Sequence, residues 1–485
     1  MSEKANDTKV FSNLIWRFGQ VFGGQAVSFI VSIVLARILD PEVYGTVALV
    51  TVITTVLQVF IDSGLGNALV QKKNADDLDF SSAFFFNIFV CISLYLLMFA
   101  GAPLIARFYR NSELVPIVRW VSLCLILFGV KGVQQAYVAR NYLFKRMFFA
   151  TIIGTVGGAV VGIAMACMSY GVWALVGQML FNSAMDTAIL WLTVRWKPKL
   201  IFSFERLKGL LSYSWKILVS SLLDSLQNNI TSLVIGRKYT ESDLAFYNRG
   251  KHFPTLATYV FNSSMDSVLL ATMSAEQDDR TRVSHMTRRT VRVSSYVMWP
   301  VAVGLAVCSE PIIRLLLTEK WLDCVPYMQV FCIICAFQPI YTANLSALKS
   351  LGRSDLFLKL EIIKKVLGLS LIAVSMRWGI LAMALSEVLT MFIGHMINSV
   401  PSKKLLGYGY FQQIRDILPP MLLALVMGIC VWAISLFTLP DIITLPLQIL
   451  CGVAVYIALS AAFKLDSFKY LLNIIKSMLS RRKAA

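Results

Sequence analysis

Apolar runs of about twenty residues recur along the whole 485-residue chain. Because an α-helix rises about 1.5 Å per residue, each run is long enough to cross the ~30 Å hydrocarbon core of a bilayer. Hydrophobic residues make up 57% of the chain and charged residues only 15%, whereas a soluble domain carries about 25% charged residues. The sequence therefore predicts an all-α polytopic membrane protein. This composition excludes a soluble enzyme, a secreted disulfide scaffold and a nucleic-acid binder.

The apolar runs predict fourteen transmembrane helices. Their approximate ranges are residues 14–36, 44–70, 81–106, 114–138, 147–168, 171–194, 209–236, 245–273, 290–317, 325–348, 356–376, 379–400, 417–438 and 442–463. An even number of helices places both termini on one side of the membrane. Lys and Arg gather in the N-terminus, the alternate loops and the C-terminal tail. The positive-inside rule therefore predicts that both termini are cytoplasmic, and it accounts for the net charge of +18.

The chain also repeats itself with an offset of about 200 residues. Trp16-Arg17 matches Trp215-Lys216, and the segment from Tyr170 matches the segment from Trp378 in the same order. Two six-helix lobes in the same orientation form the parallel kind of transporter repeat. The predicted domains are an N-lobe (1–196, helices one to six), a C-lobe (197–402, helices seven to twelve), two accessory helices (403–465) and a basic amphipathic cytoplasmic tail (466–485).

Polar residues recur at helical spacing inside four of the predicted helices. These stripes are Arg17, Gly24 and Ser28 on the first helix; Thr51, Thr55, Gln58 and Asp62 on the second; Lys216, Ser220, Asp224 and Gln227 on the seventh; and His252, Tyr259 and Asp266 on the eighth. Each charge would cost about 2.5–3.5 kcal/mol if it faced lipid at the helix centre. The stripes therefore predict a shared polar cavity. The alternative is that the acids brace helix packing and the cations snorkel from helix ends.

Signals for catalysis, cofactors or metals are weak in this sequence. The three histidines have no metal-binding spacing, and no phosphate-binding loop motif occurs. Cys332 and Cys335 lie in an apolar run without a second pair, which favours a packing role. Asp77-Leu78-Asp79 lies in a short loop without a nucleotide-binding domain. We therefore expect no catalytic residues, no metal and no cofactor, and we expect the glycines at 154, 158 and 162 to serve close helix packing.

Two segments carry a family resemblance. They are LARILDPEVYG from Leu35 to Gly45 and FIDSGLGNALVQKK from Phe60 to Lys73. This sequence resembles the polysaccharide-transport (Wzx-type) flippases of the multidrug/oligosaccharidyl-lipid/polysaccharide exporter superfamily, especially the lipopolysaccharide and colanic-acid exporter branch. The resemblance covers essentially the whole chain and is most specific in the first eighty residues.

The resemblance implies a bacterial inner-membrane exporter with twelve core helices, two accessory helices and a cationic central cavity. The implied cargo is an undecaprenyl-diphosphate-linked oligosaccharide, which moves by alternating access to the periplasmic leaflet for O-antigen, capsule or exopolysaccharide synthesis. The implied partners are this lipid-linked substrate, membrane lipids, a polysaccharide polymerase and glycosyltransferases, and no nucleic acid.

The resemblance and the charge pattern together give two sets of candidate site residues. The candidate substrate-binding cations are Arg17, Lys131, Lys216, Arg249 and Lys251, and the candidate polar or ion-coupling residues are Gln58, Asp62, Asp224 and Asp266. In related lipid-precursor flippases, arginines on the first and eighth helices hold the diphosphate, and Arg17 and Arg249 occupy comparable places here. The coupling ion would be H⁺ or Na⁺.

Three other classes of function remain as alternatives. An ion-coupled drug extruder of the same superfamily would have an apolar, acidic cavity, and the several cations argue against it. A glycan polymerase or ligase would need a large external loop, which this sequence lacks. A scaffold that transports nothing would have no need of charged stripes inside the membrane.

Overall fold

The computed structural model describes residues 2–62, 65–72, 74–276, 278–437, 439–473 and 476. Within these ranges the chain forms helices and turns and no strand, so the predicted all-α fold class is confirmed. The chain packs as two compact units, residues 1–245 and residues 246–485. This division by packing lies further along the chain than the predicted repeat boundary at 196/197, and the predicted domain ranges stay predictions.

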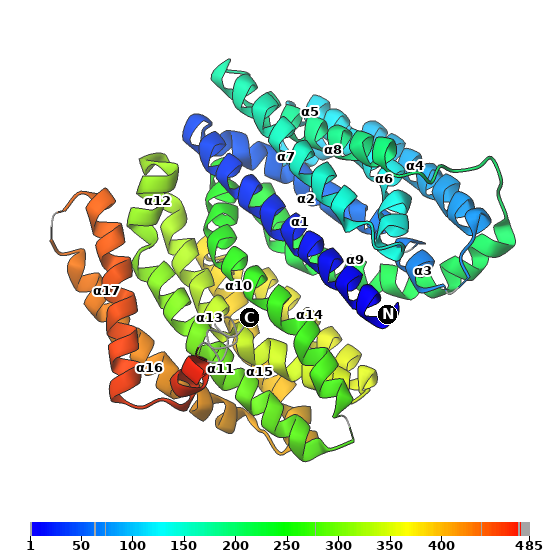
Figure 1. The fold of residues 1–485 in the computed structure, drawn as a ribbon. Coiled ribbons are helices and arrows are strands. Elements are labelled where there is room, and N and C mark those ends of the chain that lie inside the picture. The colour runs from blue at the N-terminus through cyan, green and yellow to red at the C-terminus, as the bar shows by residue number, and fades with distance from the viewer. Residues whose placement is uncertain are drawn as a thin grey trace. The chain divides into compact units, whose positions relative to one another are not determined.

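The first unit consists of nine helices within the described residues (Figure 1). They are α1 (Ser2–Ile38), α2 (Pro41–Asp62), α3 (Leu65–Gln71), α4 (Asp77–Tyr109), α5 (Leu114–Val121), α6 (Leu123–Arg140), α7 (Phe144–Cys167), α8 (Val172–Thr193) and α9 (Phe204–Lys238). Pro41 opens α2, where its fixed φ suits a first helical residue. Asp76 and Asp79 form a capping box that begins α4. The Asp79 backbone N–H bond to the Asp76 carboxylate holds the pKa of Asp76 below its usual value.

Helices α7 and α8 pack closely along the predicted glycine stripe. A Cβ at Gly154 would lie 3.0 Å from the Asn182 carbonyl oxygen, and one at Gly158 would lie 2.9 Å from the Gln178 carbonyl oxygen. These distances are too short for a side chain, so only glycine lets the two backbones approach this closely. The packing role predicted for these glycines is confirmed.

The segment after α8 folds back onto the start of α4. The Trp196 ring packs between Phe80 and Tyr137, at centroid distances of 5.5 and 6.0 Å. Lys199 pairs with Asp77 at 2.5 Å, although both side chains are largely exposed. The connection to α9 is therefore fixed to the first unit by aromatic packing as well as by charge.

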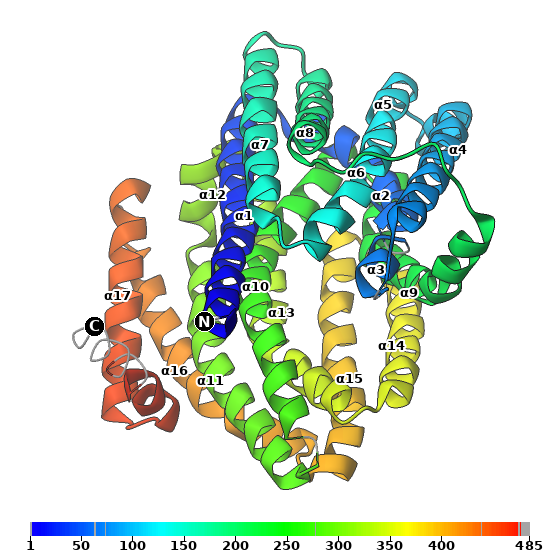
Figure 2. The same ribbon diagram turned by 45° about the vertical axis from the view of Figure 1, so that its right-hand side comes forward.

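The second unit contains the remaining described helices (Figure 2). They are α10 (Glu241–Ala275), which begins in the first unit, α11 (Arg280–Val307), α12 (Ser309–Leu317), the 3-10 helix η1 (Glu319–Cys324), α13 (Val325–Ser350), α14 (Ser354–Ser375), α15 (Ile380–Leu406), α16 (Tyr410–Ile434) and α17 (Asp441–Ala462). Helices α14 and α15 lie side by side, and α11 packs on both α13 and α16. Two arginines of α11, Arg288 and Arg292, share the buried Asp416 carboxylate of α16 at 2.6 Å each.

Ten helical stretches of the described chain are long and apolar enough to cross a membrane. Four further helices, α8, α9, α10 and α14, have 22 to 35 residues but are not among these ten. All four carry ionisable residues that lower their mean hydropathy. The ten stretches and these four helices correspond to the fourteen predicted segments, and the count of fourteen spans stays a prediction.

Several predicted boundaries differ from the observed ones. The predicted helix over 44–70 is two helices, α2 and α3, and the predicted helix over 290–317 is α11 and α12. Helix α11 begins at Arg280 because Asp279 caps it, accepting bonds from two backbone N–H groups. Polar residues lengthen this helix beyond the apolar run, and apolar periodicity alone does not detect such an extension.

The start of the predicted tail packs against α11. The Arg289 guanidinium lies 3.8 Å from the centroid of the Tyr470 ring, and the Phe468 ring lies 6.4 Å from Tyr296. Residues 474–475 and 477–485 lie outside the described residues. That the tail lies on the anionic leaflet stays a prediction.

Candidate functional site

A cavity of about 540 Å³ lies inside the first unit. Its walls combine two cations, three amide side chains and an apolar surface. The lining residues are Arg17, Gln58, Ile61, Leu65, Gly66, Val70, Asn87, Lys131, Gly132, Val133, Gln135, Ala136, Ala139, Phe144 and Met147. No carboxylate belongs to this described lining. Three of the predicted site residues, Arg17, Gln58 and Lys131, therefore lie in one cavity, although they come from α1, α2 and α6.

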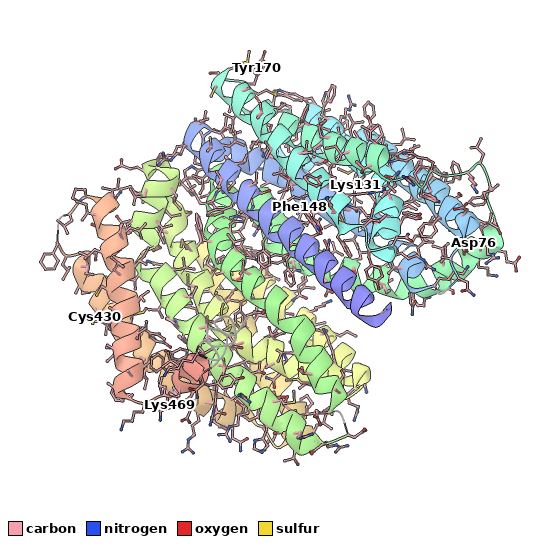
Figure 3. The ribbon with its side chains drawn as sticks, in the orientation of Figure 1. Asp76, Lys131, Phe148, Tyr170, Cys430 and Lys469 are labelled. Carbon is pink, nitrogen blue, oxygen red and sulfur yellow. The ribbon has the colours of Figure 1, made fainter. Side chains whose placement is uncertain are left out.

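Lys131 forms a buried ion pair at one side of this cavity. Its ammonium lies 2.6 Å from Asp186 Oδ2 of α8, and the two side chains are only 14% and 12% exposed. The ammonium also lies 4.9 Å from the centroid of the Phe128 ring. Figure 3 shows Lys131 among the helices of the first unit. The pairing lowers the cost of a charge inside the membrane, because an isolated ammonium there would lose its hydration without compensation.

Only one of the two oxygen atoms of the Asp186 carboxylate has a described hydrogen-bond partner. Its Oδ1 atom is buried and has no hydrogen-bond partner among the described residues. An unpaired buried acceptor costs about 1–3 kcal/mol. Asp186 lies in the predicted apolar run 171–194, but the sequence does not reveal its pairing with Lys131, because no spacing along one helix relates α6 to α8.

Arg17, at the wall of the same cavity, has different neighbours from Lys131. Its guanidinium donates to Gln20 Oε1 at 2.6 Å, lies 3.8 Å from Met147 Sδ and sits 5.7 Å from the Phe144 ring centroid. Among the described side chains it forms no ion pair with a carboxylate. Arg17 therefore brings a full positive charge to the cavity, whereas Asp186 compensates the charge of Lys131.

Two other predicted cations belong to the second unit. Lys251 pairs with Glu387 of α15 at 3.1 Å, and Tyr247 donates to the same carboxylate at 2.5 Å. The Arg249 guanidinium lies 5.1 Å from the Trp321 ring and is 8% exposed. Sequence analysis missed Glu387, although a lone carboxylate in the apolar run 379–400 was an available signal.

The structure does not test the other four predicted residues as part of this cavity, except for Asp224, which is not among its lining residues. Asp224 is exposed on α9. The side chains of Asp62, Lys216 and Asp266 lie outside the described residues. The assignment of all nine residues to substrate or ion binding stays a prediction. No group of three or more His, Cys, Asp or Glu residues that could hold a metal occurs in the described part of the chain.

The chain is similar to bacterial proteins of surface-glycan synthesis. It is 23% identical over 435 residues to the succinoglycan biosynthesis transport protein ExoT of Rhizobium meliloti (strain 1021), covering 88% of this chain and 87% of the relative. It is 24% identical over 404 residues to the lipopolysaccharide biosynthesis protein WzxC of Escherichia coli (strain K12), covering 81% and 80%.

The fold is also similar to that of a solved transporter. The inward closed structure of the lipid II flippase MurJ matches with a TM-score of 0.78 at 15% sequence identity, covering 93% of this chain and 98% of MurJ. At this identity the match shows the fold alone. It confirms the predicted fold of a polytopic all-α protein.

A family profile described as "polysaccharide biosynthesis protein" matches residues 34–326. This match extends over more than half of the chain and includes both segments on which the predicted resemblance rests. The chain therefore belongs to the polysaccharide biosynthesis protein family.

Proposed function

We propose that this chain is a flippase that moves an undecaprenyl-diphosphate-linked oligosaccharide from the cytoplasmic to the periplasmic leaflet of the bacterial inner membrane. The observation that carries the proposal is the cavity of the first unit. It brings together the exposed Arg17 guanidinium, near the start of the apolar stretch of α1, and the buried Lys131 ammonium, among helices that are long and apolar enough to cross a membrane. Charged side chains inside such a bundle are costly unless they pair with one another or serve a polar or ionic substrate.

The chemistry of the cavity fits a diphosphate linked to sugars. A guanidinium binds phosphate oxygens through charge-assisted hydrogen bonds, which are about twice as strong as neutral ones. The amides of Gln58, Asn87 and Gln135 can donate to and accept from sugar hydroxyls. The apolar lining residues lower the local dielectric constant, which strengthens these electrostatic contacts. The lipid tail needs no polar site because it can stay in hydrocarbon.

The named relatives support this class of cargo. ExoT is described as a transport protein of succinoglycan synthesis and WzxC as a protein of lipopolysaccharide synthesis. MurJ, whose fold this chain shares, is described as a lipid flippase. We infer transport rather than catalysis, by alternating access, with both termini cytoplasmic. Polysaccharide polymerases and glycosyltransferases would act before and after this step.

The proposal predicts a defined phenotype for loss of the gene. Deletion should abolish one surface polysaccharide and leave its lipid-linked repeat unit on the cytoplasmic leaflet, because the diphosphate headgroup cannot cross hydrocarbon unaided. Mass spectrometry of lipid extracts and glycan display on intact cells measure the two effects. Normal display in a strain without a redundant flippase would contradict the function, and a plasmid copy of the gene serves as the control.

Substitution of Arg17 tests the cavity cation. Arg17→Ala and Arg17→Gln should reduce glycan display at normal membrane abundance, because losing a charge-assisted contact costs about 1.5–3 kcal/mol, or roughly ten- to a hundred-fold in affinity. Arg17→Lys should retain more export. Arg107→Ala, at the exposed end of α4, is the matched control. A helix-end cation that only snorkels would tolerate Gln, so wild-type display by Arg17→Gln would remove the support for this role.

Substitutions in the Lys131–Asp186 pair distinguish a role in stabilising the fold from a role in binding the cargo. Lys131→Gln or Asp186→Asn alone should destabilise the protein by about 3–5 kcal/mol, because each leaves an unpaired buried charge. The double variant should recover most of the stability and still export poorly, since the cavity has lost a cation. Thermal unfolding in detergent and glycan display measure the two properties. Full export by the double variant would show that the pair is only a brace.

A further inference from the structure

An amide side chain holds the Arg17 guanidinium at the cavity of the first unit. Arg17 Nη1 donates to Gln20 Oε1 at 2.6 Å, about one turn further along α1. Gln20 Nε2 donates in turn to Thr151 Oγ1 of α7 at 3.3 Å. Two hydrogen bonds in series therefore connect the cavity cation of α1 to a neighbouring helix. Neither Gln20 nor Thr151 belongs to the described lining of the cavity, so their effect on a bound substrate passes through Arg17.

The sequence of α1 places these groups on one face of the helix. Arg17, Gln20 and Gly24 follow one another at spacings of three and four residues, which align side chains along one side of a helix. A Cβ at Gly24 would lie only 3.0 Å from Thr151 Cγ2, so the glycine lets α1 and α7 approach closely. This approach brings the Thr151 hydroxyl within reach of the Gln20 amide.

Thr151 also determines which end of the Gln20 amide faces Arg17. A guanidinium only donates hydrogen bonds, whereas an amide has an accepting oxygen and a donating nitrogen. Because Gln20 Nε2 is bound to Thr151 Oγ1, Gln20 Oε1 is turned toward Arg17. The reversed amide would set two donors against each other. The amide therefore holds the guanidinium in a defined orientation.

The amide contact leaves most of the guanidinium available to a substrate. A guanidinium has five N–H donors, and Arg17 uses Nη1 for both Gln20 and the sulfur of Met147. No described residue accepts a hydrogen bond from Arg17 Nε or Nη2. These two nitrogens form an edge that can bind two oxygens of one phosphate. The described neighbours of Arg17, including the Phe144 ring, are all uncharged, so its positive charge is also available.

We propose that Gln20 is a positioning and specificity-determining residue of the substrate site. Its neutral amide holds Arg17 Nη1 and leaves the Nε–Nη2 edge, with the full positive charge, for a phosphate of the cargo. A carboxylate at position 20 would form an ion pair with Arg17 and compete with that phosphate. An apolar side chain would leave the guanidinium unordered, and binding would then cost more side-chain entropy. This inference rests on the proposed flippase function and names the residue that adapts Arg17 to an anionic substrate.

Gln20→Glu tests the role of charge, because glutamate has the size of glutamine. The variant should bind undecaprenyl diphosphate roughly ten- to a hundred-fold more weakly than the wild type. Microscale thermophoresis of the full-length protein in detergent measures this affinity. Undecaprenol, which lacks the phosphates, should bind equally to both proteins. Gln71→Glu makes the same change at an exposed position of α3 and should match the wild type.

Thermal unfolding shows whether weaker binding by Gln20→Glu reflects a damaged fold. The new carboxylate can pair with Arg17 and accept from the Thr151 hydroxyl, so the variant should unfold at the wild-type temperature or above it. A loss of affinity without a loss of stability is the result expected for a residue that controls the charge of the site.

Gln20→Met and Thr151→Val test the role of orientation. Methionine has a similar length but no amide, and valine replaces the Thr151 hydroxyl with a methyl group. Each variant should bind undecaprenyl diphosphate about two- to ten-fold more weakly than the wild type, because Arg17 keeps its charge but loses its fixed orientation. In an Arg17→Gln background, Gln20→Met should have no further effect, because Gln20 acts through Arg17.

Wild-type affinity of Gln20→Glu for undecaprenyl diphosphate would overturn the inference, and so would wild-type affinity of Gln20→Met. If Gln20→Glu does not accumulate, Gln20→Met and Thr151→Val decide. Failure of the proposed function is recognised separately, because then the wild-type protein would bind undecaprenyl diphosphate no more tightly than undecaprenol, and its gene would not restore glycan display in the deletion strain.

Discussion

A charge inside the membrane has to meet a partner within the protein, and this constraint organises both units. Water is absent from the hydrocarbon core, so every ammonium and carboxylate there needs an opposite charge, an aromatic face or a substrate. Lys131 meets Asp186, Lys251 meets Glu387, and Lys364 meets Glu361. The first two pairs each join two helices, α6 with α8 and α10 with α15, and in the first unit glycines of α7 also let α8 approach closely. Helix packing therefore determines which charged side chains can pair.

Unlike these paired charges, Arg17 has no carboxylate partner among the described side chains. It has an amide, a thioether and an aromatic ring as neighbours. A strongly charged guanidinium without a carboxylate partner is suited to an anionic substrate.

Much of the fold follows from the sequence, because the bilayer imposes its requirement locally. A run of about twenty apolar residues is long enough to span wherever it occurs, and the glycine stripe of α7 predicts close packing by its spacing alone. The helix boundaries are less predictable where polar residues continue a helix, as at the start of α11. Of the candidate site, Arg17, Gln58 and Lys131 could be predicted because each is polar within an apolar run. The carboxylates that pair with Lys131 and Lys251 could not be predicted, since Asp186 and Glu387 come from distant helices whose pairing only the folded chain defines.

We propose that the cavity of the first unit binds the polar headgroup of a lipid-linked oligosaccharide. Site-specific photo-cross-linking tests this most directly, with p-benzoylphenylalanine in place of Gln58 in the cavity or in place of Phe89, which is 67% exposed on α4. In cells that export the glycan, the probe at position 58 should capture the lipid-linked repeat unit, the probe at position 89 should not, and Arg17→Gln should weaken the capture. Equal capture at both positions, or none at position 58 in a variant that still exports, would contradict the account.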